Sequence, residues 1–180
     1  YDPGDAGGLG QVTFQIDDRV YRKFQLKERH RQDGILLDHF GIWNQELTGS
    51  GMDAWFDDLM VNGQRFTFDR DPQWEAAGNH VQFEEPIVRP FHRYGYSRTD
   101  HAGGDPGECG GIIFRDEKPS FYGGKTQLLN LQQELFASGK IAFHGGGADS
   151  AMTIGWFNSE KEQKQTPEYV EKQKNHLGIV

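Results

Sequence analysis

The sequence predicts an all-β sandwich with a short C-terminal helix, built as a single domain of 180 residues. Short apolar runs recur along the chain and are separated by turn-forming residues, a spacing typical of sandwich strands. The chain contains 24 glycines, and aromatic residues make up 13% of it, although all hydrophobic residues together reach only 35%. We therefore expect a core of Phe, Trp and Tyr side chains packed between many turns.

The first part of the chain is expected to hold two strands. Residues 1–10 are rich in glycine and predict a loose N-terminal segment. Val12, Phe14 and Ile16 then alternate with polar residues, which indicates a strand with one apolar face. The apolar run over residues 35–43 predicts a second strand, and the charged run over residues 27–31 predicts a solvated connection to it.

Residues 52–61 and 64–68 predict a β-hairpin, because Asn62-Gly63 between two such runs favours a type I′ turn. Within the first run, strict alternation would place Trp55 and Asp57 on one face of the strand and Phe56 and Asp58 on the other. One of the two aspartates is therefore expected to face inward or to lie at a bulge.

The remaining elements are shorter. Residues 71–74 predict a turn or one helical turn, and residues 81–83, 111–114, 140–143 and 151–157 predict strands, the last two joined by a glycine-rich loop over residues 144–150. Residues 128–136 fit either a helix or an irregular connection. A helix is expected over residues 166–176, because Thr166 can cap its start ahead of Pro167 and Gly178 follows its end.

Charge and composition limit the partners. The formal net charge is −8 and the basic residues are scattered, which argues against nucleic acid. No apolar run approaches the roughly 20 residues that a membrane-spanning helix needs, so no membrane span is expected. Cys109 is the sole cysteine, so no internal disulfide can form, and we interpret it as a small, partly buried residue. Because the chain starts at Tyr1 and stops in an apolar run at Val180, we expect a mature or excised part of a longer protein.

The stretch over residues 89–111 is the predicted functional region. Its glycines allow sharp turns and close approach of a ligand to the main chain, and its polar side chains can donate, accept or transfer protons. The candidate residues in this stretch are Arg89, His92, Arg93, Tyr94, Tyr96, Arg98, Asp100, His101, Asp105 and Glu108.

These residues allow three interpretations. As a catalytic site, a tyrosine and a histidine or Glu108 would move protons on a sugar while an arginine neutralises a uronate carboxylate. As a metal site, Asp100 and Asp105 with Asp149 of the later loop would bind calcium, and the histidines would favour a zinc-like ion, but the spacing matches no established metal motif. As a binding surface, aromatic rings would stack on sugars while Arg, Asp and His side chains bind hydroxyl groups.

Several residues elsewhere extend the predicted ligand-binding set. His144 can join the region if the loop over residues 144–150 folds against it. Trp156 and Asn158 follow a strand and can line a groove, although tryptophan more often lies in a core. Carboxylate pairs suited to glycoside hydrolysis can be drawn from Glu75, Glu84, Glu85 and Glu108, but the sequence does not set their separation.

The run Trp55-Phe56-Asp57-Asp58-Leu59 resembles a late strand of the concanavalin-A-like and laminin-G-like jelly rolls, which are common in extracellular carbohydrate-active proteins. The resemblance covers mainly residues 10–68. It implies a jelly-roll-like sandwich that is secreted or at the cell surface, frequent calcium, and a sugar site on a concave sheet or among loops. No catalytic residue follows from it, because the strand and tyrosine-lysine signatures of jelly-roll alginate lyases are absent.

We therefore predict an extracellular carbohydrate-recognition domain that binds polysaccharide or oligosaccharide through residues 89–111. Two alternatives stay open. One is a polysaccharide lyase or glycoside hydrolase that uses the Arg, His, Tyr and Glu cluster at residues 89–108. The other is a structural or assembly protein, in which open strand edges pair between copies of the chain.

Overall fold

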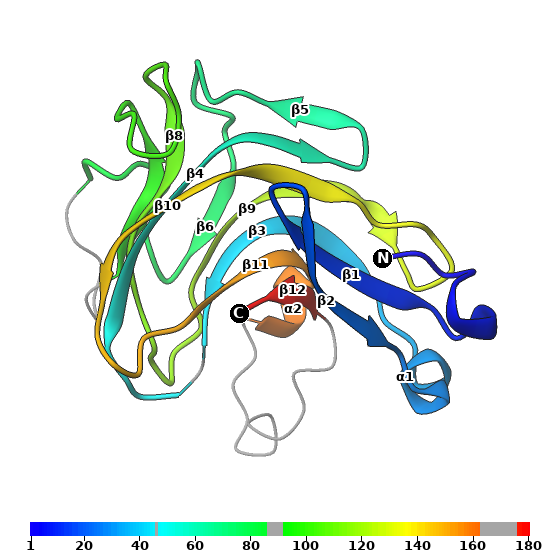
Figure 1. The fold of residues 1–180 in the computed structure, drawn as a ribbon. Helices are drawn as coiled ribbons and strands as arrows, with labels where there is room; N and C mark the ends of the chain where they lie inside the picture. Colours follow the sequence, from blue (N-terminus) through cyan, green and yellow to red (C-terminus); the bar gives the residue numbers. More distant parts are fainter. Residues whose placement is uncertain (46, 86–91, 163–175) are drawn as a thin grey trace.

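The computed structural model describes residues 1–45, 47–85, 92–162 and 176–180, and it confirms the all-β sandwich. Two antiparallel sheets, each of five strands in the described part, curve around a common core, and a separate two-stranded hairpin lies outside them (Figure 1). We call the sheets sheet I and sheet II.

Sheet I has the strand order β10-β4-β8-β7, and β5 pairs with the end of β4. These strands are β4 (Gly51–Val61), β5 (Gln64–Phe66), β7 (Arg93–Ser97), β8 (Glu108–Phe114) and β10 (Ala137–Gly146). Sheet II has the order β12-β11-β3-β9-β6. Its strands are β3 (Leu37–Asn44), β6 (Glu75–Ala77), β9 (Phe121–Leu129), β11 (Met152–Phe157) and β12 (His176–Ile179).

The chain crosses repeatedly from one sheet to the other. β3 and β4 lie in different sheets, as do β8 and β9, β9 and β10, and β10 and β11. Most neighbours within a sheet are therefore distant in sequence, which is the arrangement of a sandwich with crossed connections rather than of a simple meander.

The main core fills the space between the sheets and is rich in aromatic residues, as the composition predicted. Burial of each large side chain of this kind contributes about 1.5–3 kcal/mol to folding. Fully buried members include Leu37, Ile42, Tyr94, Ile113, Tyr122 and Leu129, which come from strands of both sheets.

The predicted Asn62-Gly63 hairpin is confirmed. It joins β4 to β5, and Asn62 and Gly63 have φ angles of 47° and 84°, as a type I′ turn requires. The strand predicted around Phe14 is also confirmed as β1 (Gln11–Ile16). It pairs with β2 (Arg19–Gln25), which the sequence did not predict because charged residues interrupt its apolar pattern.

The N-terminal region is more ordered than predicted. A short 3₁₀ turn, η1 (Ala6–Gly8), lies within residues 1–10, and the terminal ammonium of Tyr1 donates to the carbonyl of Leu135 at 2.6 Å. The charged connection predicted at residues 27–31 is exposed as expected but forms helix α1 (Glu28–Asp33), in which Arg29 and Asp33 make an i,i+4 ion pair at 3.6 Å.

Later elements depart from prediction in several places. Of the two alternatives for residues 128–136, the irregular connection is confirmed and the helix is not formed, although β9 extends to Leu129. Residues 81–83 contribute only a bridge from Gln82 to Tyr96, and the predicted loop at residues 144–150 begins inside β10. Helix α2 (Ser159–Glu162) follows β11. The helix predicted over residues 166–176 lies outside the described residues, except that His176 begins β12.

None of the helices in the described part of the chain is long and apolar enough to cross a bilayer.

Sheet II carries a second aromatic cluster on its outer face, above a row of glycines. The rings of Trp43 and Phe157 meet with centroids 5.0 Å apart, and Phe121 meets Phe157 at 5.1 Å. These rings pack beside a row of four glycines, one from each of four neighbouring strands and paired in register. The row consists of Gly178, Gly155, Gly41 and Gly123. The glycines therefore make room for an aromatic layer outside the main core.

Candidate functional site on the outer face of sheet I

Only part of residues 89–111 is a loop. Residues 93–97 form β7 and residues 108–111 begin β8, so the loop spans residues 98–107, while Arg89 lies outside the described residues. The expectation of one glycine-rich loop is wrong for a steric reason. A Cβ at Gly110 would overlap the carbonyl oxygen of Ala54 on β4, and a Cβ at Gly111 would overlap that of Arg93 on β7. These glycines serve close strand packing.

Strand alternation divides the candidates between the two faces of sheet I. Tyr94 and Tyr96 point into the core, where they are 1% and 7% exposed, and the Tyr94 hydroxyl donates to Ser120 Oγ at 2.9 Å. Burial raises the pKa of Tyr94. Arg93 and Ser97 occupy the alternate positions on the outer face of the sheet, where Arg93 is partly exposed and Ser97 is buried. The tyrosines therefore do not meet a ligand on the outer face. Of the two histidines predicted to pair with a tyrosine, His92 is fully buried and contacts Tyr94 edge-to-face at 5.8 Å, whereas His101 lies on the outer face.

Glu108 anchors the loop over residues 98–107. Its side chain is fully buried, and its two carboxylate oxygens accept the backbone N–H groups of His101 and Ala102, each at 2.8 Å. Within the described residues no cation pairs with Glu108. The two charge-assisted hydrogen bonds therefore offset the free-energy cost of removing its carboxylate from water. Glu108 therefore positions the loop and is closed to a ligand.

Asp57 supports the same loop from β4. Asp58 beside it has a φ of 50° at a β-bulge opposite β10, which confirms the predicted irregularity of the two aspartates. Asp57 Oδ1 accepts the Asp58 N–H at 2.6 Å, and a Cβ at Gly103 would overlap Asp57 Oδ2. Burial raises the pKa of Asp57, and the neighbouring charges of Asp58 and Glu108 act in the same direction.

His101 and His144 contact each other on the outer face of sheet I. The sequence predicted this contact on the condition that the segment after residue 143 folds against residues 89–111. Their ring centroids are 4.4 Å apart in an edge-to-face contact, and His101 also lies 4.6 Å from the indole of Trp55. Both imidazoles are exposed, whereas Trp55 is 2% exposed and forms the floor beneath them.

A cation–π contact extends this group of rings. Phe83 meets Trp55 edge-to-face at 4.9 Å, and the Arg93 guanidinium lies 4.5 Å above the Phe83 ring. The Arg93 Nε also donates to the Phe83 carbonyl at 3.4 Å. We call His144, His101, Trp55, Phe83 and Arg93 the outer-face site.

Other predicted ligand-binding residues lie elsewhere. Trp156 is 7% exposed in the core and packs edge-to-face on Phe40 at 5.1 Å. Asn158 donates from Nδ2 to the Leu36 carbonyl at 3.1 Å. Arg98 is exposed at the start of the loop over residues 98–107, the loop that also carries His101 of the outer-face site.

The three predicted metal ligands are not brought together. Asp100 and Asp105 are exposed in the loop over residues 98–107. Asp149 lies in another turn, where Oδ1 accepts the Ser50 N–H at 3.0 Å and the main-chain carbonyl accepts from Arg115 at 2.8 Å. Among the described residues, no group of three or more His, Cys, Asp or Glu side chains is arranged to hold a metal ion.

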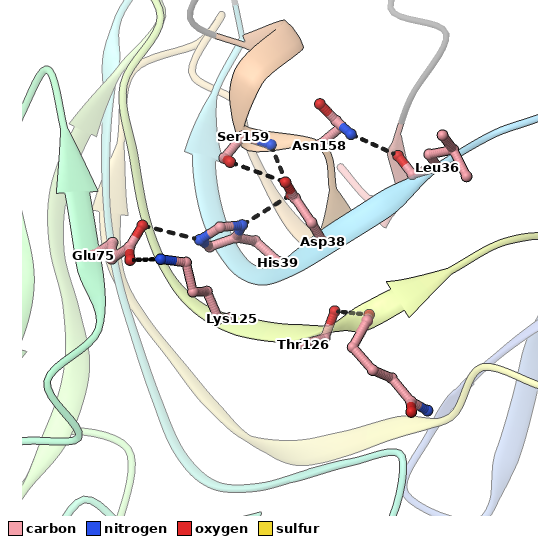
Figure 2. A network of polar contacts seen from close by, with 9 residues as sticks. Leu36, Asp38, His39, Glu75, Lys125, Thr126, Asn158 and Ser159 are labelled. Carbon is pink, nitrogen blue, oxygen red and sulfur yellow. Dashed lines mark hydrogen bonds and ion pairs between the residues drawn. The ribbon is translucent and has the colours of Figure 1, made fainter.

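A second polar cluster lies on sheet II and was not predicted (Figure 2). His39 Nδ1 lies 2.8 Å from Asp38 Oδ1, and His39 Nε2 lies 3.3 Å from Glu75 Oε2. Glu75 also pairs with Lys125, and Asp38 accepts the Ser159 N–H at 2.8 Å. Burial alone would raise the pKa of Asp38, but the bonds from His39 and Ser159 hold it below its ordinary value. The cluster ties β3, β6, β9 and α2 together.

Of the carboxylates considered for glycoside hydrolysis, Glu84 is exposed, and the other three are held by contacts within the fold. Glu75 belongs to the cluster on sheet II, Glu108 is buried on sheet I, and Glu85 accepts the N–H groups of Val81 and Gln82 at 3.0 and 3.3 Å. Cys109 is fully buried on the core side of β8, and burial raises the pKa of its thiol, as befits a packing residue.

The sequence missed Trp55 and Phe83 as members of the site. For Trp55 a signal was present, because alternation along residues 52–61 already separated it from Phe56. Nothing in the sequence placed Phe83 beside it, since that contact depends on a chain segment far from β4 in sequence.

Comparisons with known proteins give no relative to this chain: no family model, no curated protein and no solved structure matches it. The geometry of the site is therefore the basis for any statement of function.

Lowering the pH from 7 to 5 is expected to reduce stability by about 2 kcal/mol through His92. Burial lowers its pKa from 6.5 to about 4, and its Nε2 has no hydrogen-bond partner among the described residues. The unfolded chain takes up this proton near pH 6.5, so stability present above that pH is lost as the pH falls toward 4. Urea unfolding at both pH values should show a smaller loss for His92→Gln, and equal losses in both proteins would contradict the assignment.

Proposed function

We propose that this protein binds polysaccharide through the outer-face site. The observation that carries the proposal is the contact between the exposed imidazoles of His101 and His144 above the buried indole of Trp55. Such rings offer both a flat surface for the apolar face of a sugar and nitrogen atoms that bond to its hydroxyl groups.

A preformed arrangement supports this proposal, because ordering a loop during binding reduces affinity. Glu108 holds the backbone of His101 through a bond of 2.8 Å, and Asp57 packs against Gly103 in the same loop. His101 is therefore set in place by the fold rather than by the ligand.

Arg93 adds a cation at one end of the site. No ion pair joins it to a carboxylate of the described residues, and its guanidinium carbon lies 4.5 Å from the centroid of the Phe83 ring. Its remaining donors can bond to sugar hydroxyl or carboxylate oxygens. Binding of acidic polysaccharides is therefore expected to weaken as salt increases, because salt screens exposed charges.

The test is affinity electrophoresis in gels that contain a panel of neutral and uronate-containing polysaccharides. At least one polymer is expected to retard the native protein, and the double variant His101→Ala, His144→Ala should bind it at least about tenfold more weakly, since two side chains that bond to the ligand are lost. His30→Ala, which removes an exposed histidine on α1, is the matched control. Absence of retardation by every polymer, or equal retardation of the double variant, would refute the proposal.

Self-assembly is the second candidate function, and the edge of sheet I favours it. β10 pairs only with β4 in the described part, and it exposes Ile141 and Phe143 by 48% and 62%. Open strand edges of this kind can pair with a second copy. Analytical ultracentrifugation that shows a monomer at all accessible concentrations would exclude this alternative. Extracellular location and calcium stay predictions of the family resemblance.

A further inference from the structure

The structure contains a hollow of about 280 Å³ whose lining shares no residue with the outer-face site. It lies between β3 and β9 on one side and the β4–β5 hairpin on the other. Its floor is made by Phe40, Phe66 and Trp74, and amide side chains of Asn62, Gln64 and Gln127 stand at its rim.

The aromatic floor is rigid. Trp74 packs edge-to-face on Phe66 at 5.2 Å and on Phe68 at 5.4 Å, and it also meets Tyr122 at 5.3 Å. A Cβ at residue 124 would lie 2.5 Å from the Trp74 Nε1, so Gly124 is what lets the indole lie against β9. Trp74 lines the hollow, and its Nε1 makes no hydrogen bond to another described residue.

The rim is polar and almost uncharged. Asn62 Oδ1 accepts the Phe136 N–H at 2.9 Å, which leaves the Asn62 Nδ2 group able to donate. The side chains of Gln64 and Gln127 are exposed and make no hydrogen bond to other described residues. In the described part of the chain no carboxylate lines the hollow, and the single cation there, Lys125, is paired with Glu75.

We propose that this hollow binds one neutral pyranose residue, at a site separate from the outer-face site and independent of it. A pyranose has an apolar C–H face, which packs on aromatic rings, and hydroxyl groups, which bond to amides. Ligand pockets usually range from about 300 to 1,000 Å³, so a hollow at the lower limit suits a single ring. A uronate is disfavoured, because the one cation in the described lining already has a carboxylate partner.

The experiment is titration of the whole protein with methyl glycosides of neutral hexoses, followed by the NMR signals of the Trp74 indole N–H and the Gln64 and Gln127 side-chain amides. At least one glycoside is expected to shift these three signals together. The double variant Gln64→Ala, Gln127→Ala should weaken that binding at least about tenfold, since both rim amides are lost. Gln25→Ala, which removes an exposed glutamine on β2, is the matched control and should leave the affinity unchanged.

The two proposals fail separately. If no neutral glycoside shifts the Trp74 signal, or if the rim double variant binds as the native protein does, the hollow is no sugar site, whatever the polysaccharide gels show. If the glycoside binds equally well to His101→Ala, His144→Ala, the hollow is confirmed as independent of the outer-face site. Stronger binding of the corresponding uronate than of the neutral sugar would overturn the assigned ligand class.

Discussion

Replacing Gly41 with alanine is expected to lower the free energy of unfolding by about 3 kcal/mol. Gly41 lies in the middle of the glycine row of sheet II, paired with Gly155 on one side and Gly123 on the other. A Cβ at this position would overlap the carbonyl oxygen of Tyr122 and the Cα of Gly123. Because both are main-chain atoms, the strands β3 and β9 would have to separate to admit the methyl group.

Separation of these strands would also disturb the aromatic layer above them. Trp43 and Phe157 are nearly fully buried and meet across the glycine row, so a displaced backbone loses packing on two large rings. The strain and the lost packing therefore act in the same direction.

Urea unfolding followed by circular dichroism measures this effect. Gly145→Ala is the matched control, since Gly145 also lies in a strand but a methyl group added there would meet no described atom within 4 Å. We expect its free energy of unfolding to change by less than about 0.5 kcal/mol. Equal stability of the two variants would show that the glycine row is dispensable.

Local patterns in the sequence predicted the local structure well. The Asn62-Gly63 turn was predicted because its backbone needs positive φ at two adjacent positions, which few other residue pairs adopt. The strands around Phe14 and residues 35–43 were predicted because one or both of their faces are apolar. These features depend on neighbours in sequence alone.

The glycines between residues 89 and 111 show where such patterns fail. In sequence, Gly110 indicates a loop and Gly111 the start of a strand, yet both lie inside β8, where two neighbouring strands pass too close for side chains. The same residue type thus has two physical roles, turning and close packing, and only the tertiary contacts distinguish them.

The predicted site residues are divided between the two faces of sheet I because residues 93–97, expected in a loop, form a strand. Once residues 93–97 are a strand, alternation sends Tyr94 inward and Arg93 outward, although a loop would have allowed both to reach one ligand. His144 was predicted to join His101 only if the two segments folded against each other, which they do, whereas Trp55, beneath both rings, was assigned to the fold alone. The cluster around His39 was missed because, apart from the adjacent Asp38, its members come from segments that are remote in sequence.

Replacing Glu108 with alanine is expected to lower the free energy of unfolding by about 4 kcal/mol, because two backbone N–H groups beneath the loop lose a charged acceptor. These groups belong to His101 and Ala102, and each bond is 2.8 Å long. Glu108→Gln keeps one acceptor oxygen and turns an amide group toward the second N–H, so an intermediate loss is expected. Hydrogen exchange of the two amides should accelerate in the same order.

Glu85→Ala provides the control for this prediction. Glu85 also accepts two backbone N–H groups, those of Val81 and Gln82, but its bonds are exposed, so water can replace the lost carboxylate. We expect a loss below about 1 kcal/mol there. If Glu108→Ala were equally mild, Glu108 would not be what holds the loop. If instead the loop loosens while the sheets stay folded, polysaccharide binding should fall with it, since His101 would lose its fixed place above Trp55.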